Sequence, residues 1–188
     1  MTVAIAKASV TARAASSRFN VTRDIETALT DLRTLARGSS SHHMLELCTD
    51  TLAEFPDSFE VYYHRAHAKL CLGDTLGAVA DITDAIRCNG KDPALYYFRG
   101  LWKLELSRFS EALDDFSQAI SRDAEARSEH YTEPCRMASA VAHLHLEQFD
   151  DALRASEGVD AGRKSFFDGR IWSVEEIRIH ALHRRKPY

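Results

Sequence analysis

The residues best suited to chemistry in this 188-residue chain are nine histidines and four cysteines. Glu60, His64 and His67 can share one face of a helix, because side chains three and four positions apart are neighbours there. A zinc site needs three or four such ligands at matched geometry. Histidines that are solvated or that line a groove are the more common outcome, so we expect no metal and no cofactor.

Cysteine chemistry has equally little support. Cys71 follows His67 by one helical turn, but no oxyanion donor or third group accompanies this thiol–imidazole pair. No two cysteines form a CxxC, and their spacing suits neither a disulfide framework nor a zinc site. The sequence also lacks a GxGxxG or P-loop pattern. We therefore expect a non-enzymatic protein with reduced cysteines and no catalytic residue.

Composition restricts the cellular location and the binding partners that we expect. The net charge of -4 provides no basic excess for nucleic acid, and no apolar run is as long as a membrane span. We expect a cytoplasmic protein that binds neither nucleic acid nor membrane. Residues 1–23 carry four Lys and Arg residues without Asp or Glu, a composition shared by organellar transit peptides and by frayed arms. Residues 1–20 are interpreted as a flexible arm, with organellar targeting as the alternative.

The elements that carry these residues follow from an internal repeat. Two 34-residue segments, which begin at Phe59 and Pro93, align without a gap. Aromatic, basic and small residues match in phase: Tyr62 with Tyr96, Tyr63 with Tyr97, Arg65 with Arg99, Ala66 with Gly100, Lys69 with Lys103, Ala78 with Ala112 and Ala85 with Ala119. Each small residue allows two helices to approach closely. Overpacking Gly100 or Ala112 should therefore destabilise the fold.

This pattern resembles the tetratricopeptide repeat (TPR) family. In that family an aromatic residue opens the first helix of a pair, a small residue follows four positions later, and two alanines lie seven apart in the second helix. Tyr62, Ala66, Ala78 and Ala85 match these positions. The resemblance implies an all-α fold, a right-handed superhelical stack of helix-turn-helix repeats with a C-terminal capping helix. It also implies an adaptor or scaffold that binds another protein.

The remaining chain predicts a single TPR-like domain over residues 21–188. We assign a degenerate repeat to 21–58, repeats to 59–92 and 93–126, and a second degenerate repeat to 133–160. Residues 162–172 are expected to form a loop. A capping box at Ser173 and Glu176 predicts a capping helix over 173–186, because terminal helices cover the last exposed face of a stack.

The first helix of each pair lines the inner surface of such a stack. Helical spacing predicts these groove residues: Glu60, Tyr63, His64, His67, Leu70, Ala94, Tyr97, Phe98, Leu101, Glu105, Met137 and Val141. An apolar, aromatic groove suits an amphipathic helix or an extended peptide of a partner. A flanking segment of the same chain is the other expected occupant. Some family members clamp a C-terminal carboxylate with Lys, Asn and Arg, residue types that these positions lack.

Two further functions stay open from the sequence. The chain could be a dedicated chaperone, an antitoxin or an immunity-type protein that caps one cognate partner, or a scaffold that self-associates into a homo-oligomer. On the outer faces, a solvated position is expected for six aspartates: Asp81, Asp84, Asp114, Asp115, Asp150 and Asp151.

Overall fold

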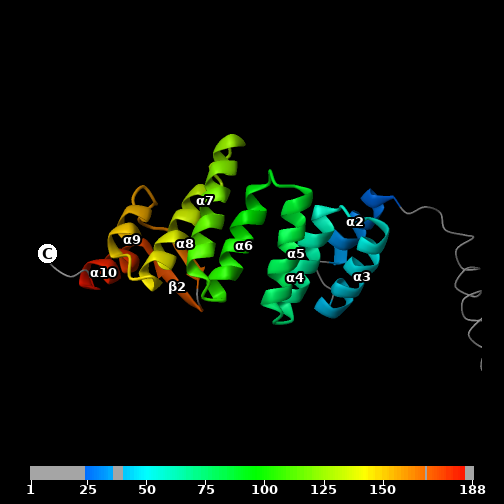
Figure 1. Ribbon diagram of the computed structural model, residues 1–188, viewed down its shortest axis with the longest axis horizontal. Coiled ribbons are helices and arrows are strands. Elements are labelled where there is room, and N and C mark those ends of the chain that lie inside the picture. The colour runs from blue at the N-terminus through cyan, green and yellow to red at the C-terminus, as the bar shows by residue number, and fades with distance from the viewer. Residues whose placement is uncertain (1–23, 36–39, 168, 185–188) are drawn as a thin grey trace, which may run out of the picture.

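The computed structural model describes residues 24–35, 40–167 and 169–184. Residues 1–23, on which the flexible arm and the targeting alternative rest, lie outside the described ranges. Figure 1 shows the helices side by side in an elongated array, with α2 and α3 at one end and α10 at the other. Among the described residues, no helix is both long enough and apolar enough to cross a bilayer.

The array is built from consecutive helices, and each helix from α2 to α9 contacts the next one along the chain. This pattern of neighbour-to-neighbour contact is typical of repeat proteins. The helices are α2 (Ile25–Leu35), α3 (Ser41–Glu54), α4 (Phe59–Cys71), α5 (Thr75–Cys88), α6 (Pro93–Glu105), α7 (Phe109–Glu125), α8 (Thr132–His145), α9 (Phe149–Ala155) and α10 (Val174–Arg184). The division into four repeats stays a prediction.

Small residues allow the close packing within each pair. Ala66 of α4 and Ala78 and Ala85 of α5 are fully buried in one core cluster. In the next pair, Ala112 of α7 is fully buried, and the ring of Phe116 lies against the backbone of buried Gly100 in α6. The aligned small residues of the 34-residue repeat therefore mark the helix–helix contacts.

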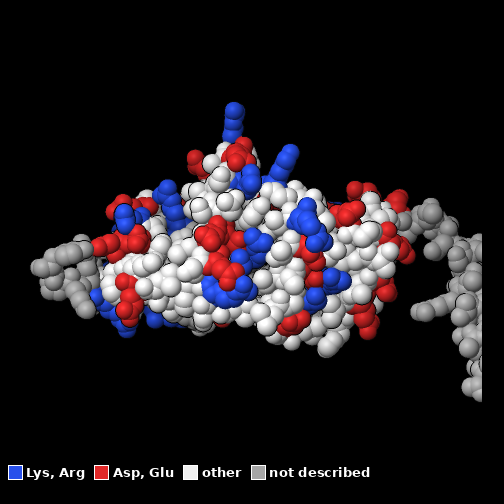
Figure 2. All heavy atoms as spheres, in the orientation of Figure 1, with Lys and Arg blue, Asp and Glu red and all other residues white. Residues whose placement is uncertain are grey.

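The outer-face prediction is wrong for two of the six aspartates, because Asp81 and Asp115 are each only 2% exposed. Each receives an Arg and a Lys from the preceding helix. Arg65 and Lys69 lie 2.7 and 2.8 Å from the Asp81 carboxylate. The matching cations of the next pair, Arg99 and Lys103, lie 2.6 and 2.8 Å from Asp115. Figure 2 shows acidic and basic side chains side by side over the middle of the array.

The expected loop at 162–172 is also wrong, because this segment forms an antiparallel β-hairpin. Strand β1 (Lys164–Phe167) pairs with β2 (Arg170–Ser173), and Phe166 lies opposite Ile171. Aromatic and β-branched residues favour strands, and Gly169 adopts the positive φ of 72° in the connecting turn. Phe167 and Trp172 are buried in the core while Phe166 and Ile171 are exposed.

The capping box at the start of α10 is confirmed. The Glu176 carboxylate accepts a hydrogen bond of 2.8 Å from the Ser173 backbone N–H, and Ser173 Oγ accepts one of 3.2 Å from the Glu176 N–H. Helix α10 then packs against α8 and α9, and β1 packs against α6 and α8. The C-terminal segment thus covers the end of the stack with a helix and a hairpin together.

Candidate functional site

Helices α4 and α6 bring a row of aromatic rings to one surface. The ring centroids of Tyr63 and Phe98 lie 5.6 Å apart, and those of Phe98 and Tyr97 lie 5.4 Å apart. Tyr97 continues the row to Tyr131, at 5.3 Å. We call Tyr63, Phe98, Tyr97 and Tyr131 the aromatic row. All four side chains are only partly buried, so the row forms a surface that water and ligands can reach.

A pocket of about 350 Å³ lies along this row. Its volume falls in the range of about 300–1,000 Å³ that is usual for ligand sites. We call it the aromatic pocket, and its lining residues are Phe59, Glu60, Tyr63, His64, Asp92, Ala94, Leu95, Phe98 and Tyr131. The pocket therefore combines walls from α4 and α6 with Tyr131, which precedes α8.

A second pocket of about 420 Å³ lies between α3 and α4. It is lined by Ser41, Met44, Tyr63, His64, His67, Ala68 and Cys71. Tyr63 and His64 line both pockets, so the two hollows adjoin along α4. Cys71 Sγ lies 3.7 Å from His67 Nδ1 in this second pocket, and both side chains are exposed. Among the described residues, no three His, Cys, Asp or Glu side chains are arranged to hold a metal ion.

The charged side chains that line the aromatic pocket are carboxylates. Burial lowers the pKa of His64 against the opposing effect of Glu60, so this imidazole is neutral at pH 7. Burial raises the pKa of both Tyr63 and Tyr131, and the negative charge of Asp92 raises each further. Asp92 thus exerts its charge on tyrosines from two walls. Glu60 is paired with Arg33 of α2 at 3.1 Å.

Asp92 and Tyr131 owe their positions to helix capping. Asp92 is the N-cap of α6, where its carboxylate accepts a hydrogen bond of 2.9 Å from the Ala94 N–H. Tyr131 is the N-cap of α8, and its N–H donates to Asp123 Oδ2 at 2.8 Å. Asp123 is fully buried and also accepts the N–H of Thr132 at 2.9 Å. Two helix starts therefore complete the pocket.

Comparisons with known proteins identify the fold. No family model and no curated protein matches the chain. Among solved structures, a MamA crystal structure superposes with a TM-score of 0.63 at 16% identity, over 86% of this chain and 78% of that one. A thermophilic TPR protein from Thermus thermophilus superposes with a TM-score of 0.57 at 19% identity, over 86% and 81% of the two chains.

The chain has the TPR fold. A TPR protein from Parabacteroides merdae agrees, with a TM-score of 0.61 at 19% identity over 80% of this chain and 56% of that one. These likenesses confirm the predicted all-α repeat stack.

Within this TPR fold, the predicted groove residues differ in where they lie. Five line the aromatic pocket (Glu60, Tyr63, His64, Ala94 and Phe98), and His67 lines the pocket between α3 and α4. Tyr97 belongs to the aromatic row, and Leu70 and Leu101 are half-buried against the core. Glu105 is exposed near the end of α6.

Met137 and Val141 do not line an open groove, since both are fully buried. They belong to one core cluster with Phe167 and Trp172 of the hairpin, and Ser165 Oγ lies 3.7 Å from Met137 Sδ. The prediction of an open groove position is wrong for these two residues, because α8 packs against β1 and against neighbouring helices, and both side chains lie in the core.

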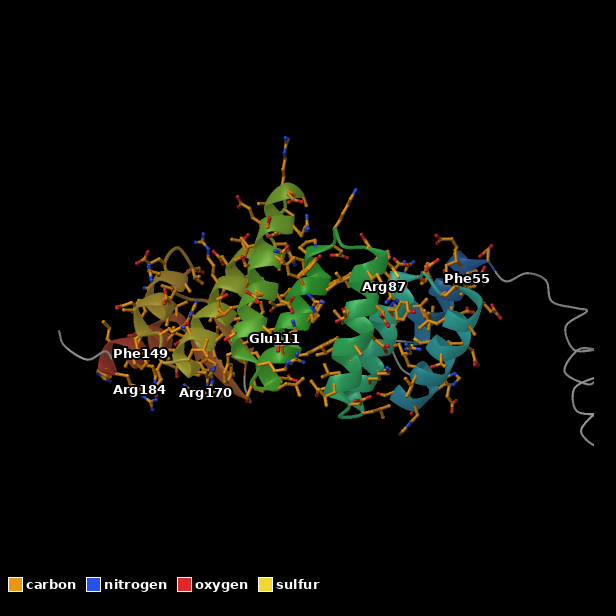
Figure 3. The ribbon with its side chains drawn as sticks, viewed as in Figure 1. Phe55, Arg87, Glu111, Phe149, Arg170 and Arg184 are labelled. Carbon is orange, nitrogen blue, oxygen red and sulfur yellow. The ribbon has the colours of Figure 1, made fainter. Side chains whose placement is uncertain are left out.

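The sequence pattern did not identify the remaining lining residues, which are Phe59, Asp92, Leu95 and Tyr131 in the aromatic pocket and Ser41, Met44, Ala68 and Cys71 in the pocket between α3 and α4. It also missed a small pocket of about 210 Å³ at the C-terminal end, which Leu144, His145, Phe149, Arg170, Trp172, His180 and Arg184 line. Figure 3 shows Phe149, Arg170 and Arg184 at that end of the array. Asp-Pro at 92–93 is a helix-start signal that could have identified Asp92.

Proposed function

We propose that this protein is a non-enzymatic adaptor or scaffold that binds a helix or extended peptide of another protein across α4 and α6. The aromatic row carries this proposal. Tyrosine and phenylalanine are the residue types that dominate binding energy at protein interfaces, and they cluster in pockets from which a partner excludes water. Here the rings of Tyr63 and Phe98 lie together in the lining of the aromatic pocket, and Tyr63 also lines the pocket between α3 and α4.

The dimensions of the surface favour a short ligand segment. The pocket between α3 and α4 and the aromatic pocket together extend across the inner sides of three helices. Beyond α6, strand β1 packs against α8, whose Met137 and Val141 are buried in the core. A partner would therefore find open pockets at α3, α4 and α6 but none formed by these two residues of α8. An amphipathic helix or a strand-like segment with alternating apolar residues suits such a surface.

The test removes one ring of the row, from a side chain that packs against the core without being fully buried. Phe98 is partly buried, and its ring contacts Tyr63, Tyr97 and Trp102. Phe98→Ala should greatly reduce recovery of a partner from the source lysate. Phe166→Ala is the matched control, because it removes an equally large ring from an exposed position on the hairpin.

Circular dichroism and size-exclusion chromatography verify that both variants fold. A partner that wild type and Phe166→Ala retain, and that Phe98→Ala loses, supports the proposal. Equal recovery by all three proteins contradicts it. Loss only in Phe166→Ala would move the binding surface to the hairpin and would also contradict it.

A further inference from the structure

We infer that the aromatic pocket receives an arginine side chain of the partner, with the guanidinium between aromatic rings and the Asp92 carboxylate. This inference rests on the proposed function and adds to it the chemistry of one anchoring residue. The pocket has four aromatic rings in its lining, from Phe59, Tyr63, Phe98 and Tyr131. Aromatic faces attract a cation, and the attraction grows when the pocket excludes water.

The charge of the pocket points to the same ligand. Its charged lining residues are Glu60 and Asp92, and both are carboxylates. Arg33 pairs with Glu60 from outside the pocket lining, whereas no Lys or Arg of the described residues forms a salt bridge with Asp92. One Oδ of Asp92 accepts the Ala94 N–H, an interaction that fixes the carboxylate at the pocket edge. A cation that entered between Tyr63 and Tyr131 would meet this carboxylate.

The chain itself joins arginine, an aromatic ring and a carboxylate twice. The Arg65 guanidinium lies 5.4 Å from the centroid of Tyr62 while it bonds to Asp81. In the next pair, Arg99 lies 5.6 Å from the centroid of Tyr96 while it bonds to Asp115. The aromatic pocket offers the ring and the carboxylate on one surface, open to a side chain from another molecule.

Arginine fits this combination better than lysine. The guanidinium is planar, stacks on aromatic faces and donates two parallel hydrogen bonds to one carboxylate. The ammonium of lysine is a compact and strongly hydrated charge, which is costlier to move between rings. The neutral His64 at the pocket wall adds no repulsion toward a cation near pH 7.

The test uses small probes on the full chain. N-acetyl-arginine amide is titrated against the protein, and the ring resonances of Tyr63 and Tyr131 are followed by NMR. N-acetyl-citrulline amide has nearly the same shape without the charge and is the neutral control. N-acetyl-lysine amide and tetramethylammonium are titrated in the same way to compare the binding of other organic cations. We expect saturable shifts with the arginine probe, weaker ones with lysine and tetramethylammonium, and none with citrulline.

Asp92→Asn gives the matched variant. Asparagine caps helices as well as aspartate does, so this change removes the charge and keeps the cap of α6. Asp74→Asn makes the same change at the N-cap of α5, where the carboxylate accepts the Gly77 N–H outside the aromatic pocket. Binding of the arginine probe should weaken about threefold to fivefold in Asp92→Asn, as expected for a partly exposed ion pair. It should stay unchanged in Asp74→Asn.

Several results overturn the inference. These are equal shifts with arginine and citrulline, tighter binding of lysine or tetramethylammonium, an equal effect of the two Asn variants, and no response to any probe. Each of these leaves the proposed function standing if Phe98→Ala still loses the partner. Conversely, a saturable arginine response together with equal partner recovery by wild type, Phe98→Ala and Phe166→Ala would contradict the proposed function alone.

Discussion

Gly100→Ala sets two effects of opposite sign against each other. In the middle of α6, alanine stabilises a helix relative to glycine by about 1 kcal/mol. However, a Cβ at Gly100 would lie 2.6 Å from Cε1 and 2.8 Å from Cδ1 of the Phe116 ring. Phe116 is fully buried, so the ring or α7 must shift. Overpacking of this kind costs about 1–3 kcal/mol, and we expect a net loss of about 1 kcal/mol in the free energy of unfolding.

Urea denaturation followed by circular dichroism measures this change, and a second background isolates its cause. In Phe116→Leu the ring is gone, so Gly100→Ala should become neutral or stabilising by up to about 1 kcal/mol. The sign of the Gly100→Ala effect thus depends on residue 116. If Gly100→Ala stabilises the protein equally in both backgrounds, the helices do not approach as closely as the structure shows, and the small-residue reasoning fails.

Three other predictions concern buried groups. Asp115→Ala removes the carboxylate that pairs with partly buried Arg99 and Lys103, leaves Lys103 only the more distant Glu111 at 3.7 Å, and should cost about 3 kcal/mol of unfolding free energy. Asp114→Ala, at an exposed site, should change it by under about 0.5 kcal/mol. Burial raises the pKa of the Cys135 thiol to about 12, so a thiol reagent at pH 8 should label exposed Cys71 first, as read by mass spectrometry. Burial alone would raise the pKa of Asp123, but hydrogen bonds from Ser128, Tyr131 and Thr132 outweigh it and lower this pKa. At pH values above its unfolded pKa of about 3.9, Asp123 therefore stabilises the folded protein, and this stabilisation is lost as the pH falls through the lower pKa of the folded state. In an acid titration, the free energy of unfolding of Asp123→Asn should therefore decline less steeply than that of the wild type.

The repeat phase could be predicted from sequence because helical periodicity is local information. Phe98 follows Tyr97, the residue that matches Tyr63 in the next 34-residue repeat, and the rings of Tyr63 and Phe98 meet across α4 and α6. Helical spacing states which face a side chain occupies. This was sufficient for Glu60, Tyr63, His64, Ala94 and Phe98 of the aromatic pocket, but it did not identify Phe59 of α4 or Leu95 of α6.

Which segment covers a helix face depends on residues far away in the chain, and for this reason the groove prediction was wrong at α8. Met137 and Val141 have the spacing of groove residues, but β1 packs on them. Nothing in the spacing of α8 predicts a hairpin that follows some twenty residues later. The buried aspartates differ, because their signal was present. Arg65 and Asp81 recur together as Arg99 and Asp115, sixteen residues apart in both repeats, and a recurring opposite-charge pair at fixed separation indicates a structural contact.

The aromatic pocket depends on the point at which the 34-residue period breaks. Asp123 is buried and accepts the backbone N–H groups at the start of α8, one of which belongs to Tyr131. The irregular segment between the third and fourth helix pairs thus places Tyr131 against Tyr97 and in the lining of the pocket. In the proposed function, the irregular segment therefore adds Tyr131 to the binding surface, while the regular repeats supply the helices α4 and α6 that line it.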